Sequence, residues 1–161
     1  MDWHTHEVSN QFDELSDYNL FDTDAPLREA IERAGAGWAG QQLSDYGGKL
    51  GSARTWQWAA EANRHTPEFD GFDARGRRVD RVSFHPAWHE LMRLHREAGS
   101  VSMAFREPQQ RGRWTAWAAH FYMEGQVEAG SMCPLSMTQA SIPVLSKEPG
   151  LWATYGDKLM S

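Results

Sequence analysis

The stretch Arg113–Lys147, RWTAWAAHFYMEGQVEAGSMCPLSMTQASIPVLSK, decides the fold of this chain. Its first half repeats apolar or small residues at steps of three and four, a spacing that predicts one continuous stripe along a helix. The residues of this stripe are Trp114, Trp117, Ala118, Phe121, Tyr122, Gly125, Ala129 and Met132. Glu124 and Glu128 lie off the stripe and one helical turn apart. For this pair, a solvated face or a core salt bridge is a commoner outcome than a catalytic pair of carboxylates.

A break is expected near Met132–Cys133, because Pro134 disfavours helix in the residue before it. A second helix then begins at Pro134 with apolar residues on two faces, which predicts that both faces are buried. Those faces carry Leu135, Thr138, Ile142 and Leu145, and Met137, Ala140, Ser141 and Val144. Pro143 deprives the carbonyl of Gln139 of its usual donor, so a kink is expected. Two buried helices meeting at a break could form one wall of a pocket, although a plain core explains the same residues.

Length, charge and cysteine content narrow the class of protein. A chain of 161 residues fits one domain, which buries roughly two thirds of its unfolded surface. The net charge of −6 argues against a nucleic-acid binder, which is usually basic. A single cysteine excludes an intrachain disulfide and fits a reducing compartment. The polar, acidic start lacks a signal-peptide pattern, and no apolar run is long enough to span a bilayer, so we expect a cytoplasmic protein.

The rest of the sequence predicts an all-α domain over residues 23–161, preceded at 1–22 by an extended arm that lies on a surface. Capping residues and prolines mark helix starts at Thr23–Asp24, at Ser52 and at Phe84-His85-Pro86. Further helices are expected near Trp38–Leu50 and after Gly150. With the two helices of Arg113–Lys147, these give a bundle of about six to seven helices.

Residues 68–84 differ from the helical sequence around them. Their spaced apolar residues, with a turn signal at Asp73–Gly76, predict a small irregular or β-hairpin insert. The insert holds the only basic cluster of the chain, formed by Arg75, Arg77, Arg78 and Arg81. Aspartates are interleaved with these arginines, so we expect a salt-bridged, solvated surface rather than a nucleic-acid contact.

Tests for catalytic motifs give only weak candidates. His85 and His89 are four residues apart, which could place two imidazoles on one metal ion, but a third ligand is missing. A helix start with ordinary polar contacts explains both. Cys133 and His120 could form a thiol–imidazole pair, but no cysteine-protease signature surrounds them, so a buried and inert cysteine is expected. The sequence contains neither a nucleophile elbow nor a glycine-rich phosphate loop.

Six blocks of sequence, in order along the chain, carry a family resemblance. They are THEVSNQ (5–11), YNLFD (18–22), RAGAGW (33–38), LGS (50–52), FHPAWH (84–89) and QVEAGSMCPLSMT (126–138). The blocks resemble the N-terminal domain of AidB-type proteins, the adaptive-response branch of the acyl-CoA dehydrogenase superfamily. The resemblance runs from about residue 4 to the end of the chain. One departure is Phe12-Asp13-Glu14, where family members often continue with prolines.

The resemblance implies a flavoprotein of three parts: an N-terminal helical domain, a central β-domain and a C-terminal helical bundle. FAD is held mainly by the later parts, and the general-base carboxylate and the DNA-binding surface come from the C-terminal bundle. The branch forms tetramers, and its N-terminal domain contributes subunit contacts and one wall of the flavin and substrate cavity. Carried over by position, Cys133, Met137 and Thr138 would line that cavity.

The resemblance also implies that this chain ends before the β-domain begins. We therefore expect it to have no catalytic residue, no metal site and no tight binding of FAD by itself. Its expected partners are the β- and C-terminal domains and further subunits, with DNA reached only through the C-terminal domain and no membrane contact. Two alternatives stay open: a free-standing helical module that binds a protein partner, and a small metal-dependent enzyme that uses His85 and His89.

Overall fold

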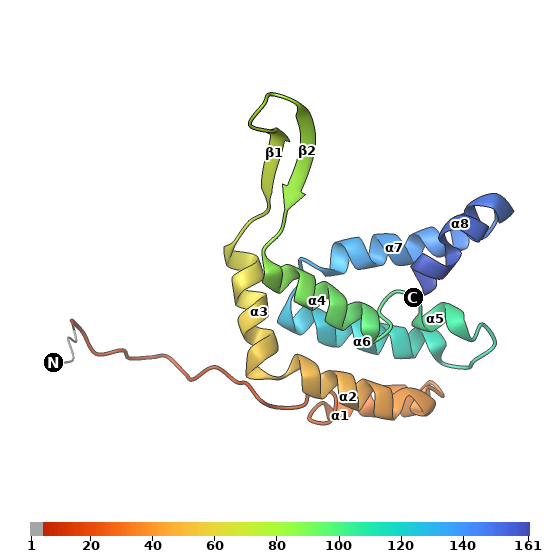
Figure 1. The fold of residues 1–161 in the computed structure, drawn as a ribbon. Coiled ribbons are helices and arrows are strands. Elements are labelled where there is room, and N and C mark those ends of the chain that lie inside the picture. The colour runs from red at the N-terminus through yellow and green to blue at the C-terminus, as the bar shows by residue number, and fades with distance from the viewer. Residues whose placement is uncertain (1–4) are drawn as a thin grey trace.

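The computed structural model describes residues 5–161 and shows helices gathered around one central helix, α6 (Figure 1). The helices are α1 (Ala25–Arg33), η1 (Gly37–Ala39, a 3-10 turn), α2 (Gly40–Leu50), α3 (Ala53–Arg64), α4 (Pro86–Glu97), α5 (Met103–Arg106), α6 (Arg113–Val127), α7 (Met132–Leu145) and α8 (Pro149–Met160). The two strands are β1 (Glu68–Phe72) and β2 (Arg78–Ser83). The predicted all-α fold with a small β insert is confirmed. The described residues form eight α-helices, and the short α5 is the one that the sequence did not predict.

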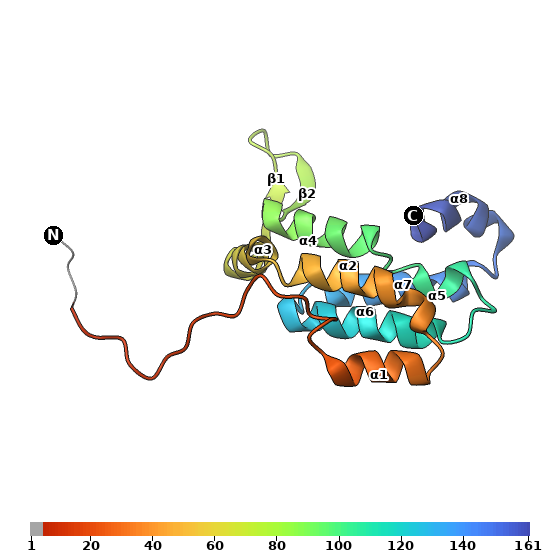
Figure 2. The same ribbon diagram turned by 90° about the horizontal axis from the view of Figure 1, so that it is seen from below.

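Helix α6 contacts α1, α2, α3, α5 and α7, and Figure 2 shows it between α1 and the pair α2 and α4. Large apolar side chains fill the spaces around it, among them Ile31, Leu43, Leu50 and Met123, all but fully buried. Each such side chain contributes roughly 1.5–3 kcal/mol by leaving water. Among the described residues, no helix combines the length and apolar character needed to cross a membrane.

Helix starts follow the capping residues of the sequence. The side chain of Asp24 accepts a hydrogen bond from the Leu27 amide at 2.9 Å at the start of α1. Ser52 caps α3 in the same way through the Thr55 amide, and His85 Nδ1 accepts from the Ala87 amide at the start of α4. Each cap satisfies a backbone donor that the helix leaves without a partner. These predicted starts are confirmed.

The face of α6 that is buried differs from the predicted stripe. The buried residues are Ala116, Ala119, His120, Met123, Glu124 and Val127, whereas Trp114 and Tyr122 of the stripe are exposed, Tyr122 to 54%. The prediction was wrong for these residues because it followed the large apolar side chains and left the polar His120 and Glu124 off the buried face. In the fold, both side chains find partners inside the core, and the small Ala116 and Ala119 let neighbouring helices approach.

Helix α7 also departs from its prediction. The break lies at residues 128–131, so α7 begins at Met132 and Pro134 sits in its first turn. The helix runs on through Pro143 to Leu145. Only one face is buried, at Leu135, Gln139 and Ile142. The prediction of two buried faces was wrong, because the described chain covers one side of α7 and leaves the other in solvent.

The arm has an exposed part and a docked part. Residues 5–16 are exposed and form no helix or strand, with a bend at Asn10, and in both views they lead away from the helices (Figures 1 and 2). The docked part begins at Asp17, whose amide donates to the carbonyl of Gly51 at 2.7 Å. Leu20 and Phe21 then enter the core. A side chain at Gly51 would collide with the Tyr18 carbonyl, so glycine is required for this docking. The expected division at residue 22 stays a prediction.

The insert is an antiparallel hairpin that projects beyond the helices (Figure 1). Phe69 pairs with Val82 and Asp70 with Arg81, and the turn places Gly76 at a φ of +75°, which favours glycine. Ion pairs join Arg77 to Asp73, Arg78 to Asp80 and Arg81 to Asp70. The hairpin predicted from the sequence is confirmed, and so are the salt bridges of these three arginines.

Candidate functional site

The predicted cavity residues lie on α7, where the chain leaves an apolar helix face in solvent. Cys133, Met137 and Val144 point away from the buried side of the helix, and Met137 is 68% exposed. We call these three residues the open face of α7. A contiguous exposed face of this kind marks a contact surface or one wall of a ligand site. The prediction of a buried Cys133 was wrong: the thiol is exposed.

The structure brings two of the three predicted residues together. Cys133 Sγ lies 4.0 Å from Met137 Sδ, one turn along the same face. Thr138 is separated from them, because it lies a third of a turn further round the helix and is half-buried. Its hydroxyl donates to the Pro134 carbonyl at 2.7 Å, and it lines a groove with Met92 and Leu159 between α4, α7 and α8. That the three residues line one cavity stays a prediction.

A group of buried polar side chains lies in the core, between α2, α4 and α6. Tyr46, His95, Ser100, His120 and Glu124 are all buried there, and we call them the polar cluster. The Tyr46 hydroxyl and His95 Nδ1 are 2.6 Å apart, and Ser100 Oγ donates to Glu124 Oε2 at 3.2 Å. Ser100 Oγ also lies 3.1 Å from His120 Nδ1, and the ring of His120 stacks on that of Tyr46 at 3.7 Å.

Burial keeps the polar cluster uncharged near neutral pH. It raises the pKa of Glu124 to about 8 and lowers the pKa of His95 to about 4 and that of His120 to about 3. Burial likewise raises the pKa of Tyr46 far above its usual range. His95 Nδ1 and Glu124 Oε2 are 3.8 Å apart, but these pKa shifts make the pair two neutral groups rather than an ion pair.

The neighbouring Glu128 shapes the junction between α6 and α7. Its carboxylate accepts hydrogen bonds from the amides of Gly130 and Ser131 at 2.6 and 2.7 Å. A carboxylate bonded to amides ahead of a helix N-terminus stabilises the start of that helix. The sequence predicted that Glu124 and Glu128 lie on a solvated face or form a core salt bridge. Both are buried instead: Glu124 bonds to Ser100, and Glu128 bonds to the amides of Gly130 and Ser131.

Several buried polar atoms of this region have no partner in the described residues: His95 Nε2, His120 Nε2, Glu124 Oε1, Ser131 Oγ and Gln139 Nε2. The cluster is enclosed by helices, so it cannot meet a substrate directly. The hydrogen bonds that the cluster does make link α2, α4, α6 and the segment after α4, so they favour one arrangement of these elements. Sequence reasoning missed the cluster, since its members come from four separate segments of the chain.

The weaker sequence candidates are not assembled by the fold. His120 is buried in the polar cluster while Cys133 is in solvent, so the thiol–imidazole pair is absent. His85 caps α4 and its ring stacks on His65 at 4.6 Å. Within residues 5–161, no three His, Cys, Asp or Glu side chains come close enough to hold a metal ion. The interpretation of His85 as part of a helix start agrees with this geometry.

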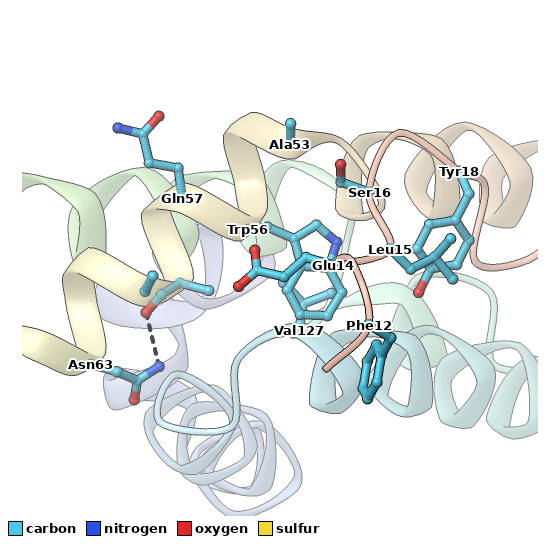
Figure 3. A pocket seen from close by; sticks show the side chains of 12 residues that line it. Phe12, Glu14, Leu15, Ser16, Tyr18, Ala53, Trp56, Gln57, Asn63 and Val127 are labelled. Carbon is cyan, nitrogen blue, oxygen red and sulfur yellow. Dashed lines mark hydrogen bonds between the residues drawn. The ribbon is translucent and has the colours of Figure 1, made fainter. Parts of the chain in front are cut away.

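A groove of about 600 Å³ runs between the arm and α3 (Figure 3). Phe12, Leu15 and Tyr18 come from the arm, and Trp56 forms part of the floor on α3. The indole nitrogen of Trp56 is buried without a hydrogen-bond partner among the described residues. The groove is mainly apolar, and its arm side depends on where residues 12–18 lie.

Comparison with solved structures identifies two proteins of the same fold. The fold is similar to ACDH-11 of Caenorhabditis elegans in complex with C11-CoA, with a TM-score of 0.80 and 20% identity over 98% of this chain and 28% of that one. It is also similar to the apo form of Bd2924, with a TM-score of 0.84 and 24% identity over 94% of this chain and 31% of that one. The chain therefore shares its fold with part of each of these two proteins.

Sequence comparison then fixes the family. Residues 10–161 match the model of the adaptive response protein AidB N-terminal domain, and the chain belongs to that family. It is 43% identical over 145 residues to AidB of Escherichia coli (strain K12), which carries the provisional name of acyl-CoA dehydrogenase. The match covers 90% of this chain and 27% of that protein. The chain thus spans about a quarter of the length of this curated relative.

Proposed function

We propose that this chain acts as the N-terminal helical domain of an AidB-like, FAD-dependent flavoprotein of the DNA alkylation response in the cytoplasm. In that role it supplies one wall of the flavin and substrate cavity and contacts between subunits, and it carries no catalytic group. FAD, DNA and any substrate are then bound mainly by the β- and C-terminal domains. The observation that carries the proposal is the open face of α7, where Cys133, Met137 and Val144 are exposed beside a complete core.

The open face fits part of a flavin and not the whole cofactor. Thiol, thioether and aliphatic side chains suit packing against a planar ring. Helix α7 contains no lysine or arginine, so the diphosphate would need cations from elsewhere. FAD is consequently expected to bind the assembled protein and to bind this chain only weakly. When bound, it supplies the redox chemistry, while α7 excludes water from one side.

A chimera tests this role, in which the chain replaces the matched segment of Escherichia coli AidB. The purified chimera should retain bound flavin, measured by its visible absorbance per protein. Met137→Arg should lower flavin occupancy at least about tenfold, because it places an unpaired charge on the cavity wall. The matched control is Ala60→Arg on the exposed side of α3, which should leave occupancy unchanged. Full occupancy in the Met137→Arg chimera, or tight FAD binding by the isolated chain, would overturn the proposal.

A further inference from the structure

The hairpin is an unpartnered sheet with two open edges. No residue of β1 or β2 is buried, and Phe72 is 67% exposed. Phe69 and Val82, which face each other across the strands, are exposed as well. An isolated two-stranded hairpin is marginally stable in water, and an open edge with apolar side chains is a template for another strand. The hairpin therefore has the form of a surface that another segment completes.

The arm is an unpartnered strand. Residues 11–16 are extended, Asn10 before them has a positive φ of 57°, and residues 5–16 take part in none of the backbone hydrogen bonds found in the described residues. Val8, Phe12 and Leu15 carry its apolar side chains into solvent, and Phe12 is 92% exposed. Extended backbone with free amides and carbonyls is what strand addition to a sheet edge requires. The arm and the hairpin edge thus each have backbone groups to which another strand could bond.

Charge selects the edge that the arm would join. Residues 5–16 of the arm carry Glu7, Asp13 and Glu14 and no lysine or arginine. Strand β2 carries Arg78, Asp80 and Arg81 and is therefore basic by one charge. Both arginines are largely exposed, although Arg78 also pairs with Asp80 and Arg81 with Asp70. Strand β1 carries Glu68 and Asp70 instead. An acidic strand beside β2 gains attraction, and beside β1 it meets like charge.

We propose that the arm of one copy adds as a third strand to the β2 edge of the hairpin of a second copy. The inference deepens the proposed subunit-contact role by naming the segments and the partner. The arm leaves the body near Gly51, and α3 lies between that point and the hairpin (Figure 1). Twelve extended residues reach roughly 40 Å, and they lead away from their own hairpin. In a twofold dimer each arm meets the other hairpin, so the contact forms twice.

Charge exchange between copies tests the proposal with the full chain. Sedimentation velocity of the unchanged chain should show a dimer that weakens with salt. One variant reverses the arm with Asp13→Arg and Glu14→Arg, and another reverses β2 with Arg78→Glu and Arg81→Glu. Each variant alone should be monomeric, with at least about tenfold weaker association. An equimolar mixture of the two should form a dimer again, because each arm then meets a complementary hairpin. Only exchange between copies predicts this rescue.

Controls make each outcome decisive. Arg28→Glu with Arg33→Glu changes two exposed charges on α1 and should leave the dimer intact. Circular dichroism shows whether every variant is folded. A monomeric unchanged chain, or a dimer that persists in both reversed variants, would overturn the proposal. So would a disulfide within one copy when Phe12→Cys and Val82→Cys are combined in a Cys133→Ser background, since that assigns the arm to its own hairpin. These assays do not depend on flavin, so they fail or succeed separately from the cavity-wall role.

Discussion

The core around the polar cluster and the open face of α7 lie on adjacent helices, yet one is complete and the other is not. Around the cluster, Tyr46, His95 and Glu124 find partners within the chain, and the apolar residues beside them are buried. On α7, the residues opposite Leu135 and Ile142 meet only solvent. The difference is that the polar cluster lies within the core of this chain, whereas the open face of α7 is exposed, as the proposed contact with further domains requires.

Raising the pH above neutrality should destabilise the core. The folded pKa of Glu124 is about 8, above the usual 4.5, so the stability from this group is full below pH 4.5 and is lost as pH rises through about 8. Between pH 4.5 and 8 the loss is about 5 kcal/mol in all, and about 2 kcal/mol of it falls above pH 6.5. The folded pKa values of His95 and His120 lie below 6.5, so their contribution is lost as pH falls below 6.5. Stability should therefore peak between about pH 6 and 7.

Urea unfolding at pH values from about 5 to about 9 measures how the free energy of unfolding depends on pH. Glu124→Gln should flatten the decrease above pH 7, because the side chain can no longer ionise. Glu29→Gln is the matched control on the exposed side of α1 and should keep the decrease. A profile for Glu124→Gln that falls as steeply as that of the unchanged chain would contradict the burial argument.

Truncating a core side chain should cost far more than truncating the open face. Leu43→Ala removes a fully buried side chain beside α6 and should lower the free energy of unfolding by about 3 kcal/mol. Met137→Ala should change it by less than about 0.5 kcal/mol, because the side chain is already in solvent. Both values come from urea unfolding at one pH. Equal losses for the two variants would mean that Met137 is as well packed as Leu43, which would contradict the comparison of the two regions.

Removing one hydroxyl from the polar cluster should have an intermediate effect. Ser100 Oγ bridges His120 Nδ1 and Glu124 Oε2, so Ser100→Ala leaves two buried polar groups without this partner and should cost about 1–3 kcal/mol. Ser136→Ala on α7 removes a hydroxyl that donates only to the Cys133 carbonyl near the surface. It serves as the control, with an expected change below about 0.5 kcal/mol. A neutral Ser100→Ala would show that the cluster does not lock the helices.

The smallest effect is expected at the hairpin in the monomer. Arg81→Ala breaks its ion pair with Asp70, but both side chains are exposed, so the free energy of unfolding should change by less than about 1 kcal/mol. Thermal unfolding of the dilute chain is the measurement. A loss above about 2 kcal/mol would mean that the pair holds the hairpin to the body.

The helix starts and the hairpin turn could be predicted from the sequence alone. Asp24 and Ser52 gave the helix starts, and the Asp73–Gly76 turn gave the hairpin, because caps and turns depend on neighbouring residues. The resemblance to the AidB branch came from long blocks kept in order. The buried face of α6 could not be read from periodicity, since burying Glu124 requires Ser100 from another segment. Likewise, the sequence of α7 shows two apolar faces and cannot say which of them this chain covers.

Thiol labelling of Cys133 tests the central claim most directly, because this residue is the single cysteine of the chain and lies on the open face of α7. The rate of labelling is compared between the isolated chain and the chimera with the rest of Escherichia coli AidB, whose own cysteines are replaced. We expect fast labelling in the isolated chain and at least about tenfold slower labelling in the chimera, where further domains would cover α7. Equal rates in the two proteins would contradict it, because α7 would then be an ordinary solvent-facing helix.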